Sequence, residues 1–440
     1  MFSIDEDIPN YSYNSNNFHL LIGENENESE FDIKLKRAWE KAEKDGVFRY
    51  KLNINNWRII EGPYKFLAQF NPDRGCKRRK PEHITTMLMP FDSTKFNFTK
   101  LQRNEIMFKI KEQEDSDIIA VNVSPIQWCH SLLIVKYLQC LPQRITQYSL
   151  QKAFELLLLS SSPYLRIAFN SLCAFASVNH LHWHLYYLKH KMLLEYIDVQ
   201  PHEGSLFLLE NFPSKGFCFK LSSSKNLETL VSSIFLFVNY LLKHQIAHNL
   251  YITRAKTTHL KKEYDDVRAY VWARKTQADV KNTTLMNPAT CELFGHIIIS
   301  NEKEYQNLTE ETIAQILNYA TREPYFLIKK DLHKIMENEI TKNERLSVTI
   351  VSTIRHCDCC IRYSLDLHEF VLIIFRSNIK ISFFFYLDLV ILFLYSLIGY
   401  FFFFIIQVFR NLRVAVKEVQ LIKKKFVDIL FSRSLEYKDL

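Results

Sequence analysis

Glycine is scarce in this sequence, with only 8 among 440 residues. None of them are grouped as GxGxxG or GxxxxGK(S/T), the patterns that build the phosphate-binding loops of dinucleotide-binding folds and P-loop proteins. In those loops glycine lets the backbone approach the phosphates closely. The absence of both patterns argues against either kind of site, so any phosphate must be recognised by other means.

Basic residues are absent from the start of the chain. Eight acidic residues precede Lys34, the first lysine or arginine, although the formal net charge of the whole chain is +8. Secretory and transit peptides begin with basic residues, so this composition favours a cytoplasmic protein. The polar and acidic residues 1–34 predict a flexible arm.

Cysteine does not follow a disulfide pattern. The nine cysteines are an odd number and are scattered along a long chain, which favours free thiols. The densest group, His356-Cys-Asp-Cys-Cys360, lacks the spaced second pair of ligands that a structural zinc site has. We therefore predict no metal site.

Hydrophobic residues are plentiful, at 48% of the chain, which is ample for a buried core. Within residues 35–345, short apolar runs alternate with amphipathic stretches, and strands outnumber helices. This pattern predicts one α+β domain with a mixed or antiparallel sheet and flanking helices. The predicted strands are 105–110, 117–123, 131–137, 165–170, 182–188, 205–209, 217–221, 248–254, 267–274 and 293–299. The predicted helices are 147–160, 225–243 and 310–321.

The tail, residues 346–440, has a different composition. Its segment 381–409 holds 29 residues with Asp388 as the only charge, which is longer than the roughly 20 residues that cross a bilayer. Two explanations stand for this hydrophobic helix. It is either a transmembrane anchor, followed by basic residues suited to the cytoplasmic side, or a gene-model artefact in which noncoding sequence is joined to the domain before it. A membrane partner is expected only if the segment is genuine.

The run His180-Leu-His182-Trp-His184 is the most distinctive motif in the chain. Alternate residues of a strand share one face, so the three imidazoles would lie together while Leu181 and Trp183 face the core. One imidazole could act as a covalent nucleophile if it were neutral and its other ring nitrogen were bound to an acceptor such as a backbone carbonyl. Alternating histidines can also bind zinc. A chance cluster among fifteen histidines is the third reading of the run by itself.

The segment before the run favours nucleotidyl transfer over zinc. Residues 169–179, FNSLCAFASVN, are small and polar and lead directly into His180. Such a loop can direct backbone N–H groups and short polar side chains at a phosphate, whereas a zinc site would gain nothing from it. The candidate phosphate-binding residues here are Asn170, Ser171, Ser177 and Asn179.

The segment FNSLCAFASVNHLHWHLYYL resembles the His-triad region of the GDP-D-glucose phosphorylases, relatives of plant GDP-L-galactose phosphorylase and, more distantly, of galactose-1-phosphate uridylyltransferase. Further matching segments follow the same order over about residues 60 to 330. They are QFNPDRGCKRRKP (69–81), KFNFTKLQRNEIMF (95–108), VNVSPIQWCHSLLI (121–134), DVRAYVWARK (266–275) and NPATCELFGHIII (287–299). The resemblance implies a HIT-like fold.

The resemblance also implies a two-step reaction at His182. This histidine would attack the α-phosphorus of a GDP-sugar, sugar 1-phosphate would leave, and inorganic phosphate would then take the guanylyl group as GDP. His180 would orient the nucleophile or hold the loop, and His184 would bind a phosphate oxygen or help to protonate the leaving phosphate. No cofactor and no catalytic metal are implied, and a homodimer is compatible with the pattern. The alternatives are a His-triad nucleotide-sugar hydrolase and a weakened, membrane-tethered nucleotide-binding protein.

The resemblance suggests a function for two further features of the sequence. A basic cluster, Arg74, Lys77, Arg78 and Arg79, is either a solvated charge run or a site that neutralises a diphosphate. His130 is either near the nucleotide or a satisfied core histidine. Nucleic-acid binding is not predicted, since no known RNA or DNA module surrounds the cluster.

The sequence departs from the family pattern at a few positions. Cys129 and Cys173 stand where glycine is expected, which questions whether the backbone fits there. His184 stands where the uridylyltransferase and the plant enzyme carry Gln, and it therefore fits the animal-type phosphorylase branch better. Trp183 is bulkier than the usual residue but keeps the face apolar.

Overall fold

The computed structural model describes residues 8–24, 27–53, 56–110, 117–278 and 285–361. The chain divides into two units, residues 1–339 and 340–440, and the fold below is that of the first unit. The predicted membrane segment, 381–409, lies outside the described residues. Among the helices that are described, none is long and apolar enough to cross a membrane.

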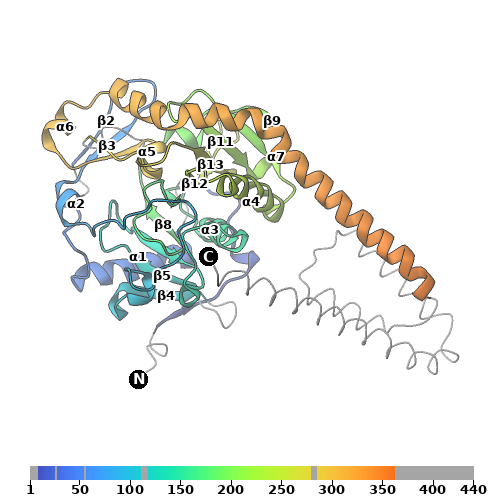
Figure 1. The fold of residues 1–440 in the computed structure, drawn as a ribbon. Helices are drawn as coiled ribbons and strands as arrows, with labels where there is room; N and C mark the ends of the chain where they lie inside the picture. The colour runs from blue at the N-terminus through green and yellow to red at the C-terminus, as the bar shows by residue number, and fades with distance from the viewer. Residues whose placement is uncertain (1–7, 25–26, 54–55, 111–116, 279–284, 362–440) are drawn as a thin grey trace, which may run out of the picture. The chain divides into compact units, whose positions relative to one another are not determined.

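One large sheet of eleven strands forms the centre of the described fold (Figure 1). All its neighbouring strands pair antiparallel except the first two, which are parallel. Their order across the sheet is β1 (Asn10–Tyr11), β4 (Ile106–Ile110), β5 (Asp117–Val121), β6 (Ser131–Ile134), β8 (His182–Tyr187), β7 (Leu165–Asn170), β12 (His248–Ala255), β13 (Asp266–Ala273), β11 (Gly216–Lys220), β10 (Leu206–Leu209) and β9 (Gln200–Glu203).

A second, smaller sheet contains both parallel and antiparallel pairs. Strand β3 (Leu67–Phe70) lies between β14 (His296–Ile299), to which it is parallel, and β2 (Trp57–Ile59), to which it is antiparallel. The short helices α5 (Thr290–Leu293) and α6 (Glu302–Gln306) contact β14. Since α5 also contacts β7 and β12, it connects the small sheet to the large one.

The long helices cover the large sheet, and polar side chains fix where they begin. They are α1 (Glu30–Lys44), α3 (Gln147–Leu159), α4 (Leu227–Lys243) and, as far as residue 339, α7 (Glu310–Ile361). The side chains of Ser29, Thr146 and Asn226 accept a hydrogen bond from the first turns of α1, α3 and α4, respectively. Each cap of this kind stabilises a helix by about 1 kcal/mol.

The main hydrophobic core lies between these helices and one face of the large sheet. Strand β8 shows how the sequence builds it, because its residues alternate between two faces. Trp183 and Leu185 are fully buried in this core, and the Trp183 ring lies 4.9 Å from that of Phe169. His182 and His184 point away from it, as the alternation predicted.

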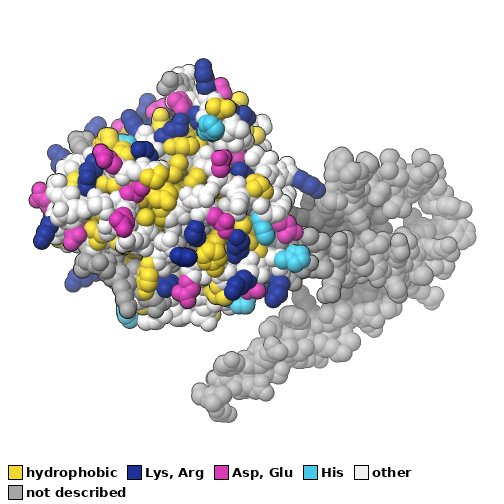
Figure 2. All heavy atoms as spheres, turned by 90° about the horizontal axis from the view of Figure 1, so that it is seen from above, with side chains coloured by type: hydrophobic (Ala, Val, Ile, Leu, Met, Phe, Trp, Pro, Cys, Tyr) yellow, Lys and Arg dark blue, Asp and Glu magenta, His cyan; other side chains and the backbone are white. Residues whose placement is uncertain are grey.

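The short connections and the outer surface complete the description. The remaining helices are α2 (Pro72–Lys77) and the 3₁₀ turns η1 (Ser15–Asn17), η2 (Phe98–Lys100), η3 (Arg103–Glu105), η4 (Tyr137–Gln139), η5 (Leu193–Glu195) and η6 (Leu221–Ser223). On the face that Figure 2 shows, lysine and arginine side chains are interspersed with acidic ones around hydrophobic areas. The described part of this face therefore has charges of both signs mixed together.

The predicted α+β class with a mixed sheet and flanking helices is confirmed, and three segments differ from their prediction. The expected arm, residues 1–34, is packed along its described part: Ile8, Tyr11 and Ile22 are buried, β1 pairs with β4, and α1 begins at Glu30. The few apolar residues in this acidic stretch are enough to anchor it, which a count of charges does not show. The first residues of the predicted strand 293–299 belong to α5 and the turn after it.

Helix α7 is also longer than the predicted helix 310–321. Pro324 lies inside it. Proline lacks a backbone N–H and usually ends or kinks a helix, which is why the sequence pattern stops just before this residue. The helix nevertheless continues, and Tyr325, Ile328 and Leu332 beyond the proline are buried in the main core.

Candidate active site

A cavity of about 610 Å³ opens on the side of β8 that carries the histidines. Its walls come from the segment around α2, the end of β5, strands β7 and β8, the loop before β8, and α5. The predicted site residues that line it are Arg74, Arg78, His130, Asn170, Ser177, His182 and His184. His180, Ser171 and Asn179 are not among the lining residues.

His182 is held in one tautomer. Its Nδ1 lies 2.7 Å from the backbone oxygen of His180, and since a carbonyl can only accept, Nδ1 carries the proton. The lone pair is then on Nε2, in a side chain that lines the cavity. Burial lowers the pKa of His182 to about 4, so the ring is neutral near pH 7. The position has the geometry that a nucleophilic histidine requires.

His180 supports this arrangement from outside the cavity. Its side chain is buried, and its Nδ1 accepts a hydrogen bond of 3.1 Å from the backbone N–H of Phe98. Its carbonyl holds His182. The backbone N–H of His182 in turn donates to Oε1 of Gln143, at 2.8 Å. His180 therefore positions the loop before β8 and the ring of His182. Its own side chain does not line the cavity.

His184 is held in the opposite tautomer through His130. The backbone N–H of Ile126 donates to Nδ1 of His130 at 3.0 Å, so the proton of neutral His130 is on Nε2. This Nε2 lies 3.0 Å from Nδ1 of His184 and must donate to it. The amide nitrogen of Asn122 also lies 3.2 Å from that Nε2, but a neutral imidazole that accepts at Nδ1 cannot accept there as well. Nε2 of His184 consequently carries its proton.

Burial keeps these two histidines neutral. It lowers the pKa of both His130 and His184 well below the ordinary value, and the positive charge of Arg74 lowers them further. The histidine strand therefore presents a lone pair at His182 and an N–H donor at His184 on the same face. A phosphate that is attacked by the first can be held by the second.

Other predicted residues hold the loop before β8. Oγ of Ser171 accepts from the backbone N–H of His248 at 3.0 Å. Oδ1 of Asn179 accepts from the backbone N–H of Gln143 at 3.0 Å, and its Nδ2 donates to the oxygen of Pro90 at 2.7 Å. The expectation that Ser171 and Asn179 face a phosphate is corrected, because their side chains are bound to the surrounding backbone. Short polar side chains commonly do this in turns.

Asn170 does face the cavity, with its oxygen already engaged. Oδ1 accepts from the backbone N–H of Thr290 at 3.0 Å and from Nδ2 of Asn249 at 2.7 Å. Its own amide nitrogen has no partner among the described residues and so can donate to a ligand. Asn170 thus connects α5 with β7, the strand next to β8.

The two cysteines that replace expected glycines adopt the backbone conformation that favours glycine. Cys129 has φ 61° and Cys173 has φ 60°. Phe175, which lines the cavity in the same loop as Cys173, has φ 70°. A left-handed backbone costs a residue with a Cβ about 1–2 kcal/mol. The chain keeps the shape of a glycine-containing loop despite the substitutions.

Aromatic and charged side chains both line the cavity. The ring of Phe98 lies 4.9 Å from the His182 ring. Arg74, Arg78 and Glu292 form a group of charges that interact with one another. Burial raises the pKa of the Glu292 carboxyl, and Arg74 opposes that effect. Glu292 was not predicted as a site residue, although it lies in the matching segment 287–299. The sequence of that segment does not show which of its side chains face the cavity.

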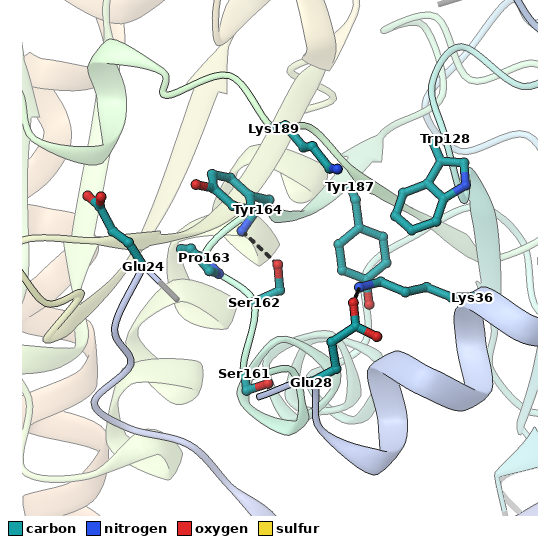
Figure 3. Close-up of a pocket in the computed structure, with 10 residues that line it drawn as sticks. All are labelled: Glu24, Glu28, Lys36, Trp128, Ser161, Ser162, Pro163, Tyr164, Tyr187 and Lys189. Atoms are coloured by element: carbon teal, nitrogen blue, oxygen red, sulfur yellow. Dashed lines mark hydrogen bonds and ion pairs between the residues drawn. The ribbon is translucent and has the colours of Figure 1, made fainter. Parts of the chain in front are cut away.

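A smaller hollow of about 180 Å³ lies elsewhere on the first unit (Figure 3). In it Lys36 pairs with Glu28 and lies 5.4 Å from the ring centre of Trp128 and 4.7 Å from that of Tyr187. The histidines of β8 do not line it. The partly buried Lys36 is already paired, and the histidine strand lines the large cavity, which is therefore the candidate active site.

The buried histidines make the fold sensitive to acid. Burial lowers the pKa of His180, His182 and His248 to about 4 and that of His296 to about 3, against 6.5 for an ordinary histidine. Above pH 6.5 both folded and unfolded chains are neutral at these sites. Below it only the unfolded chain takes up protons, so each site lowers the free energy of unfolding by about 1.4 kcal/mol per pH unit until the folded pKa is reached.

Urea unfolding at several pH values between about 7 and 5 measures this loss. The His248→Asn variant measures the contribution of one histidine outside the active site, since His248 is buried and does not line the cavity. It should reduce the pH slope of the unfolding free energy by about 1.4 kcal/mol per pH unit. An unchanged slope would show that His248 is protonated in the folded protein and would contradict the prediction.

The sheet and its histidine strand define the class of this protein. Its fold is similar to that of the yeast Ap4A phosphorylase, with a TM-score of 0.50, 15% sequence identity, and coverage of 67% of this chain and 97% of that one. This likeness shows the fold. The protein has a HIT-like α+β fold.

Comparison of sequences gives the family within this class. The models "GDPGP1-like, N-terminal domain" and "GDPGP1-like, C-terminal domain" match residues 30–186 and 190–325. GDP-D-glucose phosphorylase 1 of Danio rerio is 36% identical over 339 residues, 74% of this chain and 97% of the relative. The Homo sapiens protein of the same name is 37% identical over 304 residues, 66% of this chain and 79% of the relative. GDP-L-galactose phosphorylase 2 of Arabidopsis thaliana is 32% identical over 307 residues, 63% and 70% of the two chains. The chain belongs to the GDP-D-glucose phosphorylase family, which confirms the resemblance.

Proposed function

We propose that this protein is a GDP-D-glucose phosphorylase that converts GDP-D-glucose and inorganic phosphate to glucose 1-phosphate and GDP through a guanylyl group on His182. The observation that carries the proposal is the hydrogen bond from Nδ1 of His182 to the His180 carbonyl, which leaves a neutral Nε2 in the cavity. Membership of a family whose relatives bear this name supports it. Catalysis rests on positioning and charge stabilisation.

The first step exchanges one bond for another at the α-phosphorus. Nε2 of His182 forms the P–N bond, and the bond to the oxygen that bridges the two phosphorus atoms breaks, so that glucose 1-phosphate leaves with the electron pair. The ring becomes cationic, and its Nδ1–H remains bound to the His180 carbonyl, which stabilises the charge. In the second step an oxygen of inorganic phosphate attacks the same phosphorus, the P–N bond breaks, and GDP is formed.

The other cavity residues have proposed roles in these steps. Nε2–H of His184 and the amide of Asn170 donate to α-phosphate oxygens, and Ser177 lies in the same loop. Arg74 and Arg78 neutralise the second phosphate. His130 acts through His184, as its hydrogen bond indicates.

The wider proposals follow from the sequence. Residues 35–345 form the catalytic domain, and the enzyme works in the cytoplasm with a GDP-sugar and phosphate as its partners. It needs no cofactor and no metal. The polar groups of the cavity supply the charge stabilisation that the exchange requires.

The test is to incubate the purified full chain with GDP-glucose, with and without inorganic phosphate. Continuous formation of GDP and glucose 1-phosphate is expected only with phosphate. Without it, glucose 1-phosphate should appear in one burst no larger than the amount of enzyme. Release of GMP at the same rate without phosphate would replace the proposal with the hydrolase alternative. Running GDP-mannose and GDP-L-galactose in parallel measures the choice of sugar through kcat/KM.

A further inference from the structure

Arg78 and Arg79 are adjacent in the sequence but interact with different charged residues. Both line the cavity. The charge of Arg78 interacts with Arg74 and Glu292, whereas that of Arg79 interacts with Arg49 and Glu105. Arg78 has an extended backbone, φ −62° and ψ 155°, and in extended chain successive side chains point to opposite sides. The second arginine is therefore available for a different task.

Arg79 lies beside aromatic rings that adjoin the nucleophile. Its guanidinium carbon is 3.1 Å from the ring centre of Phe96, and the Phe96 ring meets the Phe98 ring edge-on at 5.9 Å. The Phe98 ring is in contact with the ring of His182. Arg79 forms no hydrogen bond or ion pair with any other residue that the structure describes. A guanidinium that lies over an aromatic ring without a hydrogen-bond partner can donate its N–H groups to a ligand.

Glu105 also lines the cavity, and its charge interacts with that of Arg79. One of its carboxylate oxygens accepts from the backbone N–H of Gln102 at 2.6 Å, which fixes the side chain. The other oxygen has no partner among the described residues. The apolar lining of the cavity includes Phe98, Leu101, Val121 and Leu132.

We propose that Arg79 and Glu105 read the guanine base of the substrate. The inference rests on the proposed function, to which it adds the residues that select the nucleotide. Guanine presents two acceptors, O6 and N7, which the fork of an arginine binds together, and an amino group at N2, which a carboxylate accepts. Adenine has an amino donor in place of O6, and this donor would face the donors of Arg79. The apolar side chains then cover the faces of the ring.

The inference is tested by nucleotide binding, which needs no turnover. Calorimetry would compare GDP with inosine diphosphate, which lacks the N2 amino group, and with 7-deaza-GDP, which lacks the N7 acceptor. The wild-type chain should bind each analogue about 10–100-fold more weakly than GDP. Glu105→Gln should abolish the preference for GDP over inosine diphosphate only, because its amide oxygen takes the bond to Gln102 and its amide nitrogen cannot accept. Arg79→Leu, which has no donor, should abolish the preference over 7-deaza-GDP only. Arg78→Lys is the matched control and should weaken all three nucleotides by the same factor.

Other results would overturn the inference. An equal loss of GDP and 7-deaza-GDP binding in Arg79→Leu would make Arg79 a phosphate contact. Unchanged base preference in both variants would remove both residues from base reading. The outcome is independent of the reaction: phosphorolysis with unchanged base preference defeats only this inference, whereas base-dependent binding without phosphorolysis defeats only the proposed function. Urea midpoints of the variants show whether they are folded.

Discussion

Replacing His182 with asparagine is expected to lower kcat for GDP-glucose phosphorolysis by at least about 10⁴-fold, the scale of loss when a covalent nucleophile is removed. Asparagine is neutral and smaller than histidine, but its amide nitrogen has no lone pair that can attack phosphorus. The strand should still form, because the backbone N–H and carbonyl of this residue both bind the side chain of Gln143. The loss therefore measures chemistry and not folding.

The covalent group itself can be measured. Rapid mixing of wild-type enzyme with GDP-glucose in the absence of phosphate, followed by intact-protein mass spectrometry, should show one guanylyl group, and adding phosphate should remove it. His182→Asn should show none. His180→Asn is the matched control, since it keeps the backbone carbonyl that binds Nδ1 of His182, and it should still acquire the group. Activity of His182→Asn within about tenfold of wild type would refute the covalent mechanism.

The face of the histidine strand could be predicted from the sequence because the relevant rule is local. Side chains alternate along a strand, so His182 and His184, two residues apart in β8, share a face. His180 precedes the strand, and its side chain does not line the cavity, so the prediction for the third histidine was wrong. The observed burial of Leu181 and Trp183 in the main core and the place of His182 and His184 in the cavity follow from that rule. The carbonyl acceptor required for a nucleophile is present and is supplied by His180.

Contacts between distant segments could not be predicted in the same way. Ser171 and Asn179 are polar residues in a loop before the histidines, and the sequence does not show that their partners are His248, Gln143 and Pro90. Polar residues in turns bind backbone at least as often as ligands.

The cavity residues Glu105 and Glu292 were missed for a related reason, and Arg79 was predicted only as one member of a basic cluster. Each lies in a segment that resembles the family, but only folding brings the segments to one cavity. Among four basic residues within six positions, the sequence gives no direction for any side chain. Direction depends on the backbone after α2, which the structure shows to be extended at Arg78.

Removing the N–H donor of His184 should cause the second large loss of kcat. In His184→Leu the N–H donor for the phosphate is lost, and kcat should fall by about 10²–10³-fold, the usual result of removing one donor that stabilises the transition state. His184→Gln should recover most of this loss, because an amide nitrogen also donates. A metal or general structural role for His184 would not be recovered by glutamine.

His130 should act only through His184, and a double-mutant cycle tests this. The hydrogen bond from the backbone N–H of Ile126 leaves the single ring proton of His130 on Nε2. His130 donates this proton to Nδ1 of His184, so the proton of His184 is on its Nε2. His130→Phe fills the same space but removes both bonds, so kcat should fall, while KM changes less because the ring is not expected to bind the ground-state substrate. In the His184→Leu background the same substitution should cost nothing further, because the interaction it supports is already gone. Additive losses would instead mean that His130 contacts the nucleotide directly.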